Sequence, residues 1–283
     1  MKKRFGLVMA GVAAFALAGM MGLAGCSSST SQSVELQVFA ANSLEKALPE
    51  VQALYTEKNP NVTFADTQFK SSGDLVAELE GGASADALIT ASTGTMDKAE
   101  EGGYTDASTR ADMFVNDLVV VTGTNSTITI SDLKELATND DIKSIAIGEP
   151  NAVPAGKYAV QALESAGLAK VTEAEDGTIT VEYDASIKDK INDGADKVGT
   201  VASYVNEGQC DVGLVYTSDL YRYDGIQNIY TVPADMHKAI KYPGAVIKDS
   251  KAASTAADFL NFCMTDEGAL KIFQQYGFEL AAE

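Results

Sequence analysis

The stretch VELQVFAANSLEKALPEVQALYTEKNPNVTF, residues 34–64, decides the fold class. Residues 34–40 form a short apolar run typical of a buried strand, and the apolar residues between positions 44 and 55 recur at helical spacing. Asn59-Pro60-Asn61 ends that helix, and residues 62–69 form the next strand. A strand, a helix and a strand in this order predict a βαβ unit with parallel strands.

The same alternation continues outward from this stretch. Residues 74–80 predict a short helix closed by Gly81-Gly82, and residues 87–91 predict a third strand. A second series of strands and helices fills residues 118–216, so we expect two α/β lobes rather than one long sheet. Residues 169–197 mix acidic, basic and Gly residues and predict either a small hairpin or an exposed loop.

The order of the elements predicts where each lobe begins and ends. Lobe 1 is expected to comprise residues 34–117 and 238–283, and lobe 2 residues 118–237. The last strand and the last two helices, within residues 242–278, return to lobe 1. The chain would then cross between the lobes twice, near Asn116-Asp117-Leu118 and near residues 233–241.

The N-terminus is typical of a secretion signal. Lys2, Lys3 and Arg4 precede an apolar run that ends in Leu23-Ala24-Gly25-Cys26. A membrane-spanning anchor is the second interpretation, but the run is rich in small residues and barely long enough. The Leu-Ala-Gly-Cys ending resembles the lipobox of bacterial lipoproteins, which implies cleavage after residue 25 and a lipid on Cys26. Residues 26–33 are mostly Ser and predict a flexible tether.

The charge excludes some classes of partner. Removing residues 1–25 leaves 258 residues, in which 18 basic residues face 40 acidic ones, a net charge of −22. Such a chain is a poor candidate for binding nucleic acid or an anionic membrane surface. Cys210 and Cys263 could pair in an oxidising compartment, but we favour two free thiols.

Two strand-to-helix turns carry hydroxyl groups where an anion could bind. Ser43 follows the first strand, and Ser71-Ser72-Gly73 follows the second. The first N–H groups of a helix lack internal partners and lie at its positive end, so a hydroxyl beside them completes an anion site without a basic side chain. The alternative is that these Ser residues only cap helices.

Two further candidates lie in the second lobe. Pro154 opens a helix after a stiff loop, which would hold the Ala155 N–H rigidly outward. Tyr216 ends the strand-like run Gly213-Leu214-Val215-Tyr216, where its hydroxyl would be a donor into a cleft. A rigid connector and a half-buried core Tyr are the alternatives.

Enzyme signatures are weak. Ser43 and Lys46 fit the Ser-x-x-Lys spacing of serine acyl enzymes, but neither Lys-Thr-Gly nor Ser-Asp-Asn occurs in the chain. The single His, His237, leaves almost no material for a catalytic triad or a His-based zinc site. We therefore expect a protein that is not an enzyme and has no cofactor or bound metal cation.

The ordered set of these motifs resembles the periplasmic molybdate-binding proteins of bacterial importers, over about residues 34–278. That family implies the type II periplasmic binding protein fold, with two lobes that are each a mostly parallel sheet flanked by helices and with two hinge crossings. The motifs that carry the resemblance are Val38-Phe39-Ala40-Ala41-Asn42-Ser43-Leu44, Ser71-Ser72, Gly81-Gly82-Ala83-Ser84-Ala85-Asp86, Val153-Pro154-Ala155-Gly156-Lys157-Tyr158-Ala159, Gly213-Leu214-Val215-Tyr216 and Ile272-Phe273-Gln274-Gln275-Tyr276-Gly277-Phe278.

The resemblance implies that the oxyanion is held between the lobes by hydrogen-bond donors alone. Carried over by position, the ligand-binding residues are Ser43, Ser72, Ala155, Val198 and Tyr216. Asn42 departs from the family, which usually has Ala there, and an insertion between Leu168 and Val198 puts the Val198 assignment in doubt.

The same resemblance implies the biological setting. The chain would be an extracytoplasmic monomer, anchored to the cell membrane through Cys26, that delivers molybdate or tungstate to an ABC importer permease. The alternatives are a binding protein for another oxyanion such as sulfate, a secreted serine acyl enzyme that uses Ser43 and Lys46, and a structural surface lipoprotein.

Overall fold

The computed structural model describes residues 33–175 and 177–282. The expected signal peptide, the lipidation site Cys26 and all but the last residue of the tether therefore lie outside the described residues. Within the described ranges, no helix combines the length and the apolar character needed to cross a bilayer.

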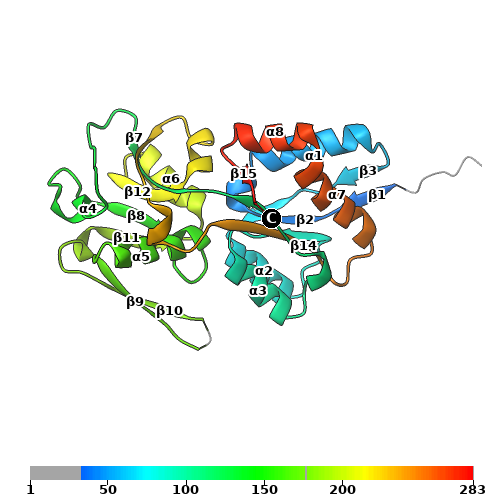
Figure 1. Cartoon of the computed structure of the whole chain (residues 1–283), viewed down its shortest axis with the longest axis horizontal. Helices are drawn as coiled ribbons and strands as arrows, with labels where there is room; N and C mark the ends of the chain where they lie inside the picture. The colour runs from blue at the N-terminus through cyan, green and yellow to red at the C-terminus, as the bar shows by residue number, and fades with distance from the viewer. Residues whose placement is uncertain (1–32, 176, 283) are drawn as a thin grey trace, which may run out of the picture. The chain divides into compact units, whose positions relative to one another are not determined.

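The first sheet has helices on both faces, and we call it and its helices lobe 1 (Figure 1). One face carries α1 (Ala47–Lys58), α7 (Ala253–Thr265) and α8 (Glu267–Gln275), and the other carries α2 (Ser72–Glu80) and α3 (Thr93–Glu101). A parallel pair, β1 (Val34–Leu36) and β3 (Val62–Phe64), lies beside it. The six strands follow the order β15 (Glu279–Leu280), β6 (Ala111–Val115), β14 (Lys241–Val246), β5 (Ala87–Ile89), β2 (Val38–Ala41) and β4 (Gln68–Lys70).

The second sheet and its helices form lobe 2. Helices α5 (Pro154–Ser165) and α6 (Val198–Asn206) pack against it, α4 (Glu135–Thr138) is a single turn, and β9 (Ala169–Glu173) pairs with β10 (Ile179–Tyr183) as a separate hairpin. The order of the five strands is β11 (Ile191–Ala195), β8 (Ile145–Gly148), β12 (Val212–Tyr216), β7 (Leu118–Gly123) and β13 (Ile226–Thr231).

The α/β architecture is confirmed, but the expectation of mostly parallel sheets needs correction. Each sheet is mixed: β2 pairs in parallel with β4 and β5, and β8 with β11 and β12, whereas β14 and β7 pair antiparallel with both neighbours. The reason is the double crossing. β7 and β14 each enter their sheet from the other lobe directly after a crossing, so they run against the strands of the βαβ units.

The crossings lie where the sequence predicts them. The first separates β6 from β7 at Asn116 and Asp117, and the second runs between β13 and β14 over residues 232–240. Residues 33–283 nevertheless form one compact unit, so the exact lobe boundaries stay a prediction.

Residues 169–197 form the hairpin β9–β10 and the edge strand β11, so the hairpin is the correct one of the two expected structures. Its interior side chain Ile179 is buried, while most of the hairpin faces solvent. Cys210 and Cys263 are both buried free thiols, as expected.

Candidate anion-binding site

A small cavity of about 10 Å³ lies between the two lobes. This volume is close to the roughly 10–15 Å³ that a single water molecule needs, so only a small ligand suits the site. The structure brings all five predicted ligand-binding residues together at this one cavity. Its lining is Ala41, Asn42, Ser43, Lys70, Ser71, Ser72, Ala91, Val153, Pro154, Ala155, Val198 and Tyr216.

Ser43 lies in a short 3₁₀ turn, Asn42–Leu44, and not in the first turn of α1, which begins only at Ala47. The predicted helix start is therefore wrong here by one turn. The Ser43 hydroxyl lies 2.9 Å from that of Tyr242, which also accepts a bond of 3.4 Å from the Asn116 amide. Because an amide nitrogen only donates, the Tyr242 proton can go to Ser43, and the Ser43 proton then stays available to a ligand.

Ser72 is the first residue of α2, and its neighbour Ser71 is the cap whose hydroxyl accepts the Asp74 N–H at 3.1 Å. Of the two roles expected for this pair, Ser71 caps the helix, and Ser72 remains the candidate for anion binding. The Ser72 hydroxyl accepts the Ala91 N–H at 2.9 Å. That bond occupies a lone pair and leaves the hydroxyl proton free to be donated to the cavity.

Lobe 2 contributes backbone amides. Ala155 follows Pro154 in the first turn of α5, and Val198 is the first residue of α6. N–H groups at these positions have no acceptor inside their helix, and they lie at its positive end. Both residues are buried, so an anion in the cavity would satisfy groups that water cannot reach.

Tyr216 is the strongest single feature of the site. It ends β12, is 1% exposed, and its hydroxyl has no hydrogen-bond partner among the described residues. Burial raises the pKa of Tyr216 well above its ordinary value, so this hydroxyl keeps its proton. A buried donor without a protein partner is rare in folded proteins, and an ordered water or an ion in the cavity could accept this bond.

Charged side chains near the cavity are all engaged elsewhere. Lys70 lines the cavity, but its ammonium group pairs with Glu78. The carboxylate of Glu45 is bound to Asn42 and Arg222, and neither Glu45 nor Asp74 lines the cavity. These two acids therefore add no negative charge to the lining of the cavity, and the groups left free toward the cavity are uncharged donors.

The lobes touch on two sides of the cavity. The Gly73 N–H of lobe 1 donates to the Ala152 carbonyl of lobe 2 at 3.1 Å, and the Gly199 N–H of lobe 2 donates to the Asn42 side chain at 3.1 Å. Sequence reasoning did not find these contacts or Tyr242. Tyr242 and Ser43 are 199 positions apart, and no local pattern marks such a pair.

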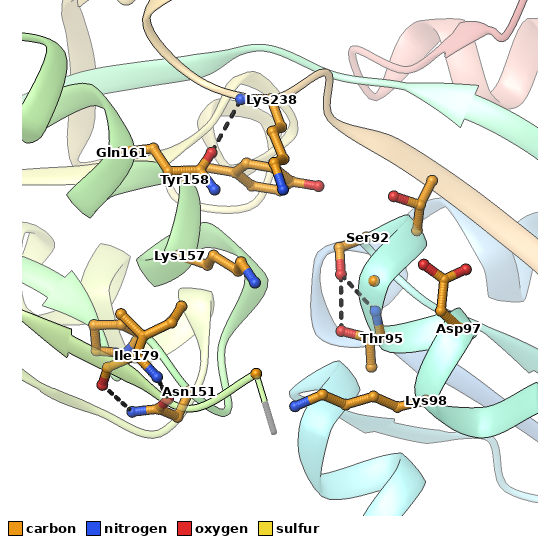
Figure 2. Close-up of a pocket in the computed structure, with 14 residues that line it drawn as sticks. Ser92, Thr95, Asp97, Lys98, Asn151, Lys157, Tyr158, Gln161, Ile179 and Lys238 are labelled. Atoms are coloured by element: carbon orange, nitrogen blue, oxygen red, sulfur yellow. Dashed lines mark hydrogen bonds between the residues drawn. The ribbon is translucent and has the colours of Figure 1, made fainter. Parts of the chain in front are cut away.

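A larger cleft of about 150 Å³ lies next to the cavity (Figure 2). Lys98 of α3 and Lys157 of α5 extend toward it from opposite sides, and Lys238 lies above them. Lys157 pairs with Glu173 at 2.8 Å, whereas no ion pair forms at Lys98 or Lys238 within residues 33–175 and 177–282. Unlike the inner cavity, this cleft is lined by flexible charged groups.

The geometry does not favour the serine acyl enzyme. The bonded partner of the Ser43 hydroxyl is Tyr242, and Lys46 is an exposed residue. Among the described residues, no group of His, Cys, Asp and Glu side chains could hold a metal cation.

Comparison with known proteins agrees with this geometry. Residues 36–279 match the family of bacterial extracellular solute-binding proteins. A putative ABC transporter substrate-binding lipoprotein of Bacillus subtilis (strain 168) is 31% identical over 98% of this chain and 99% of its own length. A molybdate-binding protein of Haemophilus influenzae is 31% identical over 90% of this chain and 94% of its own length.

Among solved structures, the substrate-binding domain of a putative molybdenum ABC transporter from Clostridium difficile is similar to this chain. It is 33% identical, with a TM-score of 0.66, and the match covers 88% of this chain and all of that one. These matches span nearly the whole described chain and both lobes. The chain belongs to the bacterial extracellular solute-binding protein family.

Proposed function

We propose that this protein captures molybdate or tungstate in the cavity between its lobes and delivers it to an ABC importer. The observation that carries the proposal is the buried, protonated Tyr216 hydroxyl, which has no partner within residues 33–175 and 177–282 and lies at a small cavity lined by further free donors. The names of the similar proteins from Haemophilus influenzae and Clostridium difficile support the choice of ligand.

Five residues are proposed to donate hydrogen bonds to the anion. Ser43 and Ser72 would donate through their hydroxyl and N–H groups, Ala155 and Val198 through their N–H groups, and Tyr216 through its hydroxyl. A dianion that leaves water must have its hydration replaced almost bond for bond. Each hydrogen bond to a charged group contributes about 1.5–3 kcal/mol net, so several of them support tight binding after the ordering costs.

A site made only of donors also selects the protonation state of its ligand. Hydrogen phosphate carries a proton that needs an acceptor, and the groups that face the cavity offer donors instead. Molybdate and tungstate carry no proton near neutral pH and accept at all four oxygens. Sulfate shares this property, so its exclusion must come from its smaller size.

Calorimetric titration of the mature protein tests the proposal. Molybdate and tungstate should bind with one site per chain and a Kd below about 1 μM, and sulfate and phosphate should bind at least about 100-fold more weakly. No heat with molybdate, or tighter binding of sulfate, would contradict the proposal.

The setting of the protein is part of the proposal. The family places the chain outside the cytoplasm, and the name of the Bacillus subtilis relative supports a lipoprotein anchored through Cys26. The protein would be a monomer, and the permease would recognise its closed, anion-bound form. Metabolic labelling with a radioactive fatty acid should mark the wild-type chain and not a Cys26→Ser variant. Label retained in that variant would contradict the anchor.

A further inference from the structure

We propose that Asn42 is a positioning residue that joins the two lobes at one edge of the cavity and thereby sets how firmly the anion is retained. Asn42, Glu45, Gly199 and Arg222 form the contact, which we call the Asn42 bridge. It concerns a property beyond ligand capture, and it depends on the proposed function only for its effect on ligand release.

The side-chain oxygen of Asn42 accepts two bonds from lobe 2. One comes from the Gly199 N–H at 3.1 Å and the other from the Arg222 guanidinium at 3.1 Å. The side-chain nitrogen donates to Glu45 at 2.8 Å, which fixes the orientation of the amide. Asn42 is 4% exposed, so water does not compete for these bonds.

Arg222 is held on its own lobe before it reaches across. Its side chain is 1% exposed and pairs with Asp219, which is fully buried. From that position it also pairs with Glu45 of lobe 1 at 2.9 Å. A guanidinium with a rigid fork of donors suits this simultaneous binding of three acceptors.

Two residues of the Asn42 bridge are sequence neighbours of residues proposed to bind the anion. Asn42 precedes Ser43, and Gly199 follows Val198. Asn42 thus takes the second N–H of α6 and leaves the first one, that of Val198, for the anion. The same bonds hold the Ser43 and Val198 donors at a fixed separation across the cavity.

These contacts consist of protein groups alone, so they favour the closed arrangement whether or not an anion is bound. A protein with two conformations responds to any contact that is made in only one of them. Loss of the bridge should therefore enlarge the open population, and it should act more on the release of the anion than on its association.

The test uses two variants and a matched control. Asn42→Ala removes both acceptor bonds. Arg222→Lys keeps a cation beside the buried Asp219 but shortens the reach to lobe 1. Glu50→Ala is the control, because Glu50 lies in α1 of the same lobe as Asn42 and accepts a bond from Tyr276 within lobe 1 at 2.5 Å.

The first measurement is the distance between spin labels on exposed sites of the two lobes, introduced as Glu57→Cys and Asp140→Cys, without any anion. Both native thiols of the described chain are buried and should not take the label. Asn42→Ala and Arg222→Lys should broaden the distance distribution, and Glu50→Ala should leave it unchanged. An unchanged distribution in Asn42→Ala overturns the proposal.

The second measurement is the dissociation rate of molybdate by stopped flow. The rate should rise about tenfold in Asn42→Ala, with a smaller change in the association rate. An unchanged dissociation rate in a folded variant also overturns the proposal. If molybdate fails to bind the wild type, the proposed function fails, and the distance measurement still decides the fate of the bridge.

Discussion

The inner cavity and the outer cleft occupy the same interface between the lobes but differ in every physical respect. The cavity is about 10 Å³ and its free groups are buried hydroxyls and backbone amides. The cleft is about 150 Å³ and holds three lysines, of which Lys98 and Lys238 are exposed. Both regions present groups that can bind an anion, but only the cavity fixes the geometry of its donors.

This difference indicates why neutral groups suit selective binding. The cavity donors are positioned by other bonds: Ser43 by Tyr242, Ser72 by the Ala91 N–H, and Val198 by the start of α6. A lysine ammonium is a mobile, strongly hydrated charge that accepts any anion within reach. Charge alone therefore raises the local anion concentration, whereas fixed neutral donors distinguish one oxyanion from another.

The largest expected effect comes from Tyr216→Phe. The variant removes one donor to the anion, so molybdate affinity should fall about 10- to 100-fold. Because the hydroxyl has no partner among the described residues, thermal stability without anion should stay the same or rise. Tyr276→Phe, which changes a hydroxyl bound to Glu50 away from the cavity, is the control for calorimetry and melting. Equal affinity in Tyr216→Phe would remove this residue from the site.

A smaller effect is expected from Gly73→Ala. A Cβ at Gly73 would lie 2.6 Å from the Ala152 carbonyl oxygen of the other lobe, so the lobes could close only after a shift. The affinity should fall about tenfold although every proposed donor remains. Gly94→Ala in α3 is the matched control, since no atom lies within 4 Å of its added Cβ. Titration calorimetry of both variants decides, and wild-type affinity in Gly73→Ala would show that this contact does not limit closure.

The smallest effect is expected in the outer cleft. Replacing Lys98 and Lys238 together by Gln should change the Kd for molybdate by no more than about twofold at 0.15 M salt, because exposed charges are screened. At low salt, the double variant should lower the association rate of molybdate by a larger factor than the factor by which it changes the Kd at 0.15 M salt. Stopped-flow measurements over a range of salt concentrations check this. A tenfold loss of affinity at 0.15 M salt would place the anion in the cleft instead of the cavity.

The fold was largely predictable because periodicity is a local property. The runs that became α1 and β12 are strongly periodic or strongly apolar, and each lies within three residues of its expected position, whereas the single strand expected at residues 34–40 is divided into β1 and β2. The direction of β14 and β7 was not predictable, because it depends on crossings between lobes and not on the residues of the strands. Pro243 even lies inside β14, where a local rule would have ended the strand.

For the candidate site, the donors could be predicted from the sequence, but the residues that position them could not. The five donors could be placed because each follows a strand end or begins a helix, and a resemblance to a known family joined them. What supports the donors was not accessible. Tyr242 orients Ser43 because β14 returns to the sheet of lobe 1, and the two residues are 199 positions apart. Arg222 holds Asn42 because the two lobes meet there, and these residues are 180 positions apart.

A crystal structure of the mature protein grown with molybdate, with the metal located by anomalous scattering, would show which groups hold the anion. We expect one metal centre in the inner cavity, with oxygens within about 3.2 Å of donors from Ser43, Ser72, Ala155, Val198 and Tyr216. No lysine ammonium or guanidinium should lie within hydrogen-bond distance of it. A metal centre among Lys98, Lys157 and Lys238, or a direct bond from Arg222 or Lys70 to the anion, would contradict the account.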